Sequence, residues 1–154
     1  MDKETQEKFF EGTNNLITSI AQQVSNTIPD TWEKFYFHAD INDDFSGRVY
    51  FFFNTEKNKK LTYSHDIPEI YNIYEDEYDE KYDKLYDLSV ELKQWFIEYE
   101  QAPWQAITII VDSERKMKMD FDYADWLSSP YSHNEMIDYF EYRYLGKMPE
   151  SKEQ

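Results

Sequence analysis

The 154-residue sequence predicts an α+β fold: an antiparallel sheet of about five strands with three helices, in the order α-β-β-β-α-β-β-α. The spacing of apolar residues indicates this fold, because it switches between a helical period and strict alternation several times along the chain. The alternating segments come in runs joined by short polar turns, which is typical of antiparallel strands. The sequence has neither a repeat nor a linker, so we expect residues 1–154 to form a single domain.

The chain is expected to begin with a long amphipathic helix, over about residues 4–27. Mostly apolar side chains recur there at steps of three and four residues, which places them on one face of a helix. They are Phe9, Thr13, Leu16, Ile17, Ile20, Val24 and Ile28. Pro29 is expected to end the helix, because a residue that precedes proline is pushed out of the helical conformation.

Three strands are predicted next. Apolar residues alternate with others in the first two strands, as they do in a sheet with one buried face. The buried positions would be Phe35, Phe37, Ala39 and Ile41 in the first strand and Val49, Phe51 and Phe53 in the second. A polar turn at 42–47 joins these strands, and the polar stretch 54–60 leads to a short third strand near residues 61–63.

A second long helix is predicted over about residues 74–99, where the apolar spacing returns to the helical period. Its apolar stripe consists of Tyr74, Tyr78, Tyr82, Leu85, Leu88, Leu92, Trp95, Phe96 and Tyr99. An acidic stripe of Asp76, Glu80, Asp83, Asp87 and Glu91 lies nearly opposite, at ~100° per residue. We therefore expect one face of this helix to pack on the sheet and the other to contact water.

A hairpin and a last helix complete the predicted fold. The hairpin turns at residues 112–115, and its two strands share one apolar face. The residues of that face are Ile107, Ile109, Val111, Met117, Met119, Phe121 and Tyr123. The last helix is expected to start at Ser132, which forms a capping box with Glu135, and to stop near Gly146 and Pro149.

The composition limits the classes of function. The chain carries 32 acidic and 16 basic residues, a net charge of −16. Such a surface repels phosphate backbones, so we expect no direct binding to nucleic acid; it would attract a basic protein, or serve solubility alone. The sequence has no cysteine, no start typical of a signal peptide and no apolar stretch near the ~20 residues that span a membrane. We therefore expect a soluble cytoplasmic protein without membrane contact.

The sequence contains no strong catalytic or metal-binding motif. Its three histidines lie outside any recognisable nucleophile motif and read as ordinary surface or strand residues. Asp120, Asp122 and Asp125 could supply oxygen ligands to a hard cation. Lys116 and Lys118 share the same strand face, which favours a solvated side of the hairpin instead. We expect no enzyme and no cofactor, and a metal-dependent hydrolase remains an open alternative.

Two features are candidates for binding a partner. The first is the acidic run of the second long helix: Asp76, Glu77, Asp79, Glu80, Asp83 and Asp87. It reads either as a docking surface for a basic protein or as a solvated helix face. The second is an aromatic set on the other sheet face that includes Tyr36, Tyr50 and Phe52. If helices cover only one face, this set is an exposed patch suited to an interface; if helices cover both, it is core.

Five strings in a fixed order carry a family resemblance. They are Ile28-Pro29-Asp30-Thr31-Trp32, the run Ile67–Ile73, Pro103-Trp104, Phe121-Asp122-Tyr123-Ala124-Asp125-Trp126 and the run Tyr144–Pro149. Together they make the chain, from about Phe9 to Pro149, resemble the YezG/EsaG family of immunity proteins from low-GC Gram-positive bacteria. We expect Trp32, Trp104 and Trp126 to be core or corner residues.

The resemblance implies an antitoxin that binds the nuclease domain of a toxin exported by the type VII secretion system. The family has no catalytic residues to transfer to this sequence. The function hypothesis is thus an immunity protein that neutralises a cognate, basic nuclease toxin through an acidic, aromatic-rich surface. A phosphate-mimicking inhibitor or adaptor of a cellular nucleic-acid-binding protein is the alternative.

Overall fold

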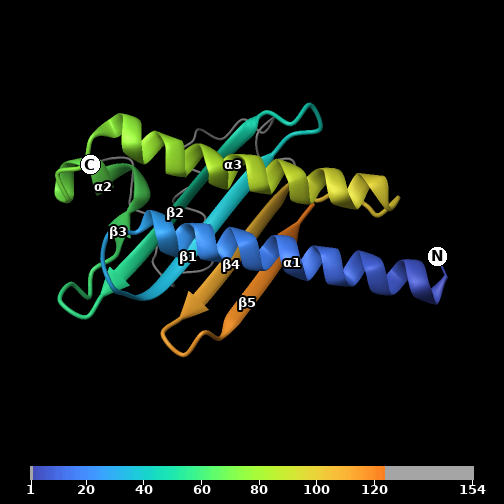
Figure 1. Cartoon of the computed structure of the whole chain (residues 1–154), viewed down its shortest axis with the longest axis horizontal. Helices are drawn as coiled ribbons and strands as arrows, with labels where there is room; N and C mark the ends of the chain where they lie inside the picture. Colours follow the sequence, from blue (N-terminus) through green and yellow to red (C-terminus); the bar gives the residue numbers. More distant parts are fainter. Residues whose placement is uncertain (1, 124–154) are drawn as a thin grey trace, which may run out of the picture. The chain divides into compact units, whose positions relative to one another are not determined.

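The computed structural model describes residues 2–123 and confirms the α+β fold there (Figure 1). The elements are α1 (Lys3–Thr27), β1 (Trp32–Ile41), β2 (Gly47–Thr55), β3 (Thr62–Tyr63), the 3-10 turn η1 (Ser64–Asp66), α2 (Ile67–Ile70), α3 (Glu75–Glu98), β4 (Ala106–Asp112) and β5 (Met117–Asp122). The helix predicted from Ser132 and the residue Trp126 lie outside the described residues. The described residues belong to one compact unit, and a single domain over the whole chain stays a prediction.

The five strands form one antiparallel sheet in the order β3-β2-β1-β4-β5. The long helices α1 and α3 lie side by side across one face of this sheet (Figure 1). The strand register puts Phe37 of β1 opposite Phe51 of β2 on one side and Ile109 of β4 on the other. All three side chains are fully buried, and they form the centre of the core below the helices. The predicted inward face of the sheet is therefore confirmed.

The ends of α1 follow from its sequence. Asp2 caps the helix, because its carboxylate accepts a hydrogen bond of 2.7 Å from the backbone N–H of Thr5. Ile28 follows the last helical residue and has an extended backbone, as expected for a residue before Pro29. Ile20 has no exposed surface, and the other predicted positions on the inner face are buried or half-buried.

The two long helices approach closely at Gly12 of α1. A Cβ atom at Gly12 would lie 2.1 Å from the ring of Trp95 on α3, so only glycine fits without movement. The Trp95 indole N–H donates to the Phe9 carbonyl over 3.1 Å, and the rings of Phe9 and Phe96 meet edge-on at 5.0 Å. The apolar stripe of α3 is thus fixed against α1 as well as against the sheet.

Two local predictions were wrong or incomplete. Tyr74 was expected in the apolar stripe, yet its side chain is 81% exposed, because it precedes the first turn of α3 where the helical spacing does not apply. The short helix α2 was not predicted, since four residues are too few to show a period. Pro68 in its first turn is a normal helix-starting position.

The β4–β5 hairpin matches its prediction except at Tyr123, which follows β5 and is 55% exposed. Val111 pairs with Met117, Ile109 with Met119 and Ile107 with Phe121. In the turn, the Asp112 carboxylate accepts the backbone N–H groups of Glu114 and Lys116 at 2.9 and 3.0 Å. Arg115 takes the left-handed conformation, with φ of 66°.

Candidate partner-binding surface

The outer face of α3 carries the most concentrated charge of the described chain. Seven acidic residues and two lysines lie between Glu75 and Asp87. The six that the sequence singled out, Asp76, Glu77, Asp79, Glu80, Asp83 and Asp87, are all exposed. Leu85 and Leu92 on the opposite face have no exposed surface. We call these six residues the acidic face of α3; the structure brings them together on one side of a helix whose other side is core.

Three tyrosines at steps of four residues hold the acidic half of α3 to the sheet layer. The hydroxyl of Tyr78 donates to the Ser64 carbonyl over 2.5 Å, that of Tyr82 to the Val49 carbonyl and that of Tyr86 to the Phe45 carbonyl. Burial is the main cause that raises the pKa of each phenol above its ordinary value. The phenols therefore stay neutral donors, and the acidic face stands on a fixed support.

His65 of η1 joins this support. Its Nε2 atom lies 2.9 Å from the Tyr82 hydroxyl oxygen. Since that hydroxyl donates to the Val49 carbonyl, the neutral ring fits best with its proton on Nε2. Burial lowers the pKa of His65.

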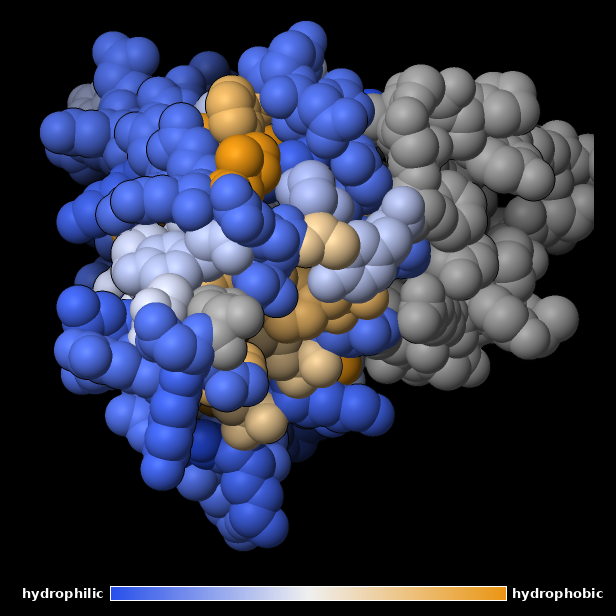
Figure 2. All heavy atoms as spheres, turned by 90° about the vertical axis from the view of Figure 1, so that its right-hand side faces the viewer, coloured by the Kyte–Doolittle hydropathy of each residue, from blue (hydrophilic) through white to orange (hydrophobic). Residues whose placement is uncertain are grey.

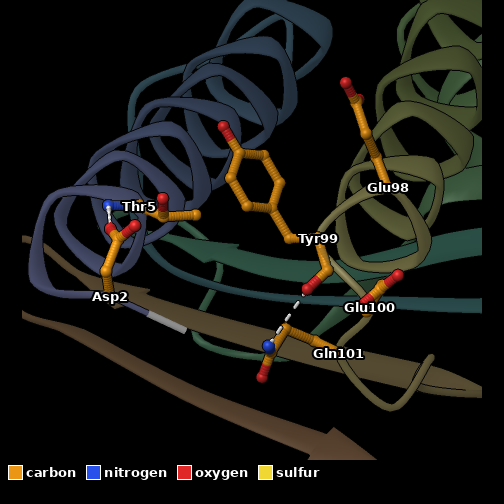
Figure 3. Close-up of a pocket in the computed structure, with 6 residues that line it drawn as sticks. All are labelled: Asp2, Thr5, Glu98, Tyr99, Glu100 and Gln101. Atoms are coloured by element: carbon orange, nitrogen blue, oxygen red, sulfur yellow. Dashed lines mark hydrogen bonds between the residues drawn. The ribbon is translucent and has the colours of Figure 1, made fainter.

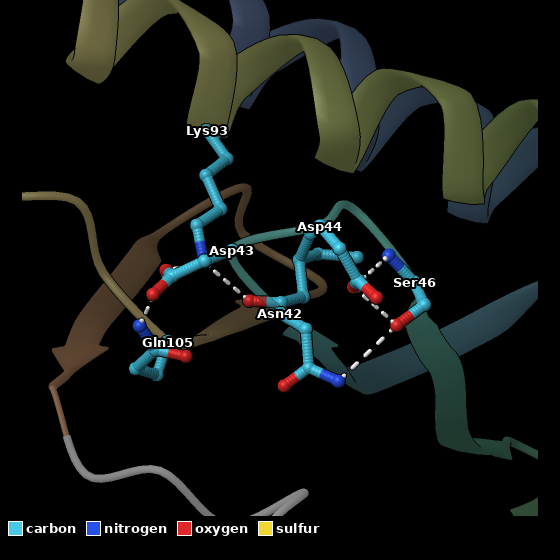
Figure 4. Close-up of polar contacts among 7 residues, drawn as sticks. Asn42, Asp43, Asp44, Ser46, Lys93 and Gln105 are labelled. Carbon is cyan, nitrogen blue, oxygen red and sulfur yellow. Dashed lines mark hydrogen bonds and ion pairs between the residues drawn. The ribbon is translucent and has the colours of Figure 1, made fainter.

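The β1–β2 loop extends the acidic surface next to α3 (Figure 4). Asp43 accepts a hydrogen bond from the Gln105 side chain at 3.1 Å and forms an ion pair with Lys93 at 3.3 Å. The hydrogen bond from Gln105, followed by the hydrogen bond and the positive charge of Lys93, holds the pKa of Asp43 below its ordinary value. The carboxylate of Asp44 accepts two hydrogen bonds from Ser46, and these lower its pKa. Two further anionic groups are thus fixed at the edge of α3.

Lys93 is a buried polar contact of α3 that sequence reasoning missed. Its side chain has no exposed surface although it belongs to the long helix with the acidic face. The ammonium donates to the Ile41 carbonyl over 2.5 Å and lies 5.9 Å from the centre of the Trp104 ring. The sequence could have indicated this burial, because Lys93 lies between Leu92 and Phe96 of the apolar stripe. Trp104 itself is fully buried, as predicted.

The aromatic candidates on the other sheet face are not an exposed patch. Tyr50 and Phe52 are 1% and 6% exposed, and Tyr36 is half-buried. The rings of Tyr50 and Phe52 pack with each other and with Tyr63: the centres of Tyr50 and Phe52 are 6.1 Å apart, and those of Phe52 and Tyr63 are 5.2 Å apart. The exposed alternative is therefore wrong for Tyr50 and Phe52. Contact of these three residues with a partner stays a prediction, although two of them offer almost no surface.

One polar cluster on the sheet contains the side-chain types of a hydrolase active site: a histidine, a carboxylate and a hydroxyl. His38 lies 3.1 Å from the Asp40 carboxylate through Nε2 and 3.0 Å from the Thr108 hydroxyl through Nδ1. A nucleophile must be reachable by its substrate. Thr108 is only 2% exposed and Asp40 only 3%. The cluster is accordingly a set of hydrogen bonds that satisfies buried polar strand residues.

The described residues offer no ready metal site. Nowhere between residues 2 and 123 do three or more side chains of the ligating types gather closely enough to hold an ion. Asp120 and Asp122 are half-buried on β5, and Asp125, the third residue of the metal hypothesis, lies outside the described part of the chain. The same described residues include no helix that is long and apolar enough to cross a membrane.

A polar cavity of about 610 Å³ lies where the start of α1 meets the end of α3 (Figure 3). Its lining is Asp2, Thr5, Glu98, Tyr99, Glu100 and Gln101. Figure 2 faces this end of the molecule and shows hydrophobic atoms surrounded by a mostly hydrophilic surface. The Asp2 carboxylate already caps α1, and the Gln101 amide donates to the Tyr99 carbonyl. The pairing of Asp2 with Thr5 in this lining is explained by the N-terminal cap of α1.

The comparisons with known proteins agree in one result. A family profile described as "Immunity protein YezG-like" matches residues 13–154. The immunity protein YezG of Bacillus spizizenii is 33% identical over 138 residues, which cover 90% of this chain and 85% of that protein. The type VII secretion system protein EsaG of Staphylococcus aureus is 35% identical over 144 residues, 94% of this chain and 88% of that protein. The immunity protein YezG of Bacillus subtilis is 32% identical over 139 residues, 90% and 91% of the two chains. The chain therefore belongs to the YezG-like immunity protein family.

Proposed function

We propose that this chain is the cytoplasmic antitoxin of a cognate nuclease toxin, and that it docks a basic domain of that toxin on the acidic face of α3. Membership of the family supports the immunity function. The name of the relative EsaG associates that protein with type VII secretion, which suggests this route for the toxin. The single observation that carries the docking surface is the exposure of six carboxylates on one side of a helix.

The physical argument for this surface is steering. A protein with a net charge of −16 attracts a basic partner from a distance and raises the rate of encounter. Charge-steered pairs reach about 10⁸–10⁹ M⁻¹s⁻¹ at low salt, against about 10⁵–10⁶ M⁻¹s⁻¹ without steering. The same charge repels nucleic acid. An antitoxin needs this combination, because it must meet the nuclease before the nuclease meets its substrate.

Rigidity of the acidic face supports tight binding. The tyrosine hydroxyls that join α3 to three carbonyls leave the helix little freedom to lose on association. Lys93 and Gln105 hold Asp43 at its edge in the same way. A pre-formed anionic surface is a good match for the positively charged groove with which a nuclease holds the phosphate backbone.

The docking surface is tested by matched charge reversals. Asp76, Glu80 and Asp83 are changed to lysine on α3; Glu4, Glu7 and Glu11 are changed to lysine on α1, where they too are exposed. Each triple alters the net charge equally and removes one acidic residue from the first turn of a helix. Stopped-flow association with the cognate toxin domain should slow at least tenfold for the α3 triple, with a weaker salt dependence, and much less for the α1 triple. Equal rates for the two triples would place the interface elsewhere.

The acidic face also supports a second candidate, an inhibitor that imitates phosphates and acts on cellular nucleic-acid-binding proteins. Such an inhibitor would bind several basic proteins in competition with DNA. An immunity protein should instead prefer its own toxin over unrelated basic proteins by orders of magnitude. Competition between the toxin domain and an unrelated DNA-binding protein of similar charge separates the two functions.

A further inference from the structure

A groove of about 610 Å³ opens between α1 and the β4–β5 hairpin. The hairpin extends beyond α1 on the side away from α3, so the groove is separate from the acidic face (Figure 1). Its lining is Thr18, Ala21, Gln22, Ser25, Asn26, Trp32, Phe35, Val111, Arg115 and Met117. Phe35 and Val111 are buried, while Met117 is 43% exposed at the rim. The groove thus has a buried apolar floor and an exposed apolar rim at Met117.

The charge of this groove is opposite to that of the protein. Among the described lining residues Arg115 is the only charged one, and none of them carries a carboxylate. This is unusual for a chain with 32 acidic residues. The wall of the groove that α1 forms contributes to this lack of negative charge, because α1 has no acidic residue after Glu11. A negatively charged group is therefore attracted to this groove and repelled from most of the remaining surface.

Arg115 is held in place over an aromatic ring. Its guanidinium carbon lies 5.0 Å from the centre of the Trp32 ring. Trp32 is itself fixed, since its indole N–H donates to the Ser25 hydroxyl over 2.9 Å and its ring meets that of Phe35 at 4.8 Å. No carboxylate among residues 2–123 forms an ion pair with Arg115. A stacked guanidinium keeps its in-plane N–H groups for a bidentate contact with a carboxylate.

We propose that this groove is a second contact with the toxin and that it receives a segment in which an apolar side chain stands next to a carboxylate. The apolar side chain covers Met117 at the rim, above the buried Val111 and Phe35, and the carboxylate pairs with Arg115. A second copy of this chain is a poor occupant, because two chains of −16 repel each other. The inference rests on the proposed function and adds the local chemistry of a second site on the partner. With one contact on each side of α1, only a partner that carries both a basic surface and this segment binds fully, which provides selectivity.

Two substitutions test the groove in the full-length chain. Arg115→Glu reverses its charge, and Gln22→Trp fills it from an exposed helix position. Lys8→Glu is the matched control, because it makes the same change in net charge at an exposed position near the other end of α1. Arg115→Lys keeps the charge and removes the planar donor pair. Thermal unfolding of each variant verifies that it folds.

The measurements are the dissociation constant for the toxin domain and hydrogen exchange of residues 106–122 in the free and bound chain. We expect Arg115→Glu to weaken binding by about 10- to 100-fold, the loss for a charged hydrogen bond. Gln22→Trp should also weaken binding, because the indole occupies the groove. Arg115→Lys should weaken binding less, Lys8→Glu should bind within about threefold of the unmodified chain, and the β4–β5 turn should gain protection in the complex. If both groove variants bind normally and the turn gains no protection in the complex, this inference alone is overturned. If the unmodified chain forms no complex, the proposed function fails, and this inference fails with it.

Discussion

The contact between Gly12 and Trp95 makes a sharp stability prediction. In an exposed helix position, alanine in place of glycine stabilises by about 1 kcal/mol. At Gly12 the added Cβ would lie 2.1, 2.7 and 2.8 Å from three atoms of the Trp95 ring. Real Cβ atoms do not approach that closely, so either the ring or α1 must move.

The ring has little room to move. Its N–H donates to the Phe9 carbonyl over 3.1 Å, and its centre lies 4.5 Å from that of the Tyr99 ring. Overpacking of this kind costs about 1–3 kcal/mol, and loss of the indole hydrogen bond adds about 1 kcal/mol. After the gain in helix propensity, Gly12→Ala should lower the free energy of unfolding by about 1–3 kcal/mol.

Urea unfolding followed by circular dichroism measures this loss. Asn15→Ala, an exposed position one turn further along α1, is the control and should be neutral or slightly stabilising. Trp95→Leu makes room for the new methyl group, so Gly12→Ala should cost much less in that background. If Gly12→Ala is as stable as the unmodified chain, the close approach of α1 and α3 is wrong.

Three further predictions concern the supports of the acidic face. Lys93→Met keeps the volume of the side chain but leaves the Ile41 carbonyl without its ammonium donor, and calorimetry should record a loss of about 1–3 kcal/mol. Tyr78→Phe removes the hydrogen bond to the Ser64 carbonyl and should cost about 1 kcal/mol in urea unfolding, whereas a neutral result would argue that this bond contributes nothing. Burial lowers the pKa of His65, so the unfolded chain binds this proton more tightly. The contribution of neutral His65 to the free energy of unfolding is complete above about pH 6.5 and decreases as the pH falls below that value. In His65→Asn, the free energy of unfolding should therefore depend less on pH between about pH 5 and 7.5.

The sequence predicted the elements whose period is long enough to read. Phe37, Phe51 and Ile109 were assigned to the buried face by alternation alone, and the register pairs them as expected. The acidic face of α3 was also predictable, because exposure on a helix follows from the apolar stripe opposite. The assignment of Tyr74 to the apolar stripe was wrong, because α3 begins one residue after it and the helical spacing does not extend to Tyr74.

The contacts that sequence reasoning missed join distant parts of the chain. Lys93 bonds to a carbonyl 52 residues away, and Trp95 to one 86 residues away. No local pattern marks Arg115, whose role depends on the fold placing Trp32 beneath it. The sequence could not decide whether Tyr50 and Phe52 are buried or exposed either. Alternation assigns residues to the two faces of a sheet but does not show what covers each face.

The most direct test of the proposed function is survival of cells that express the cognate toxin domain. The domain is co-expressed with the unmodified chain, with the α3 triple Asp76→Lys, Glu80→Lys, Asp83→Lys, or with the α1 triple Glu4→Lys, Glu7→Lys, Glu11→Lys. Growth, co-purification and nuclease activity of the complex are scored together. We expect the unmodified chain and the α1 triple to rescue growth and block cleavage, and the α3 triple to do so poorly. Failure of the unmodified chain to bind and rescue would contradict the antitoxin function, and full rescue by the α3 triple would contradict the acidic face as its docking surface.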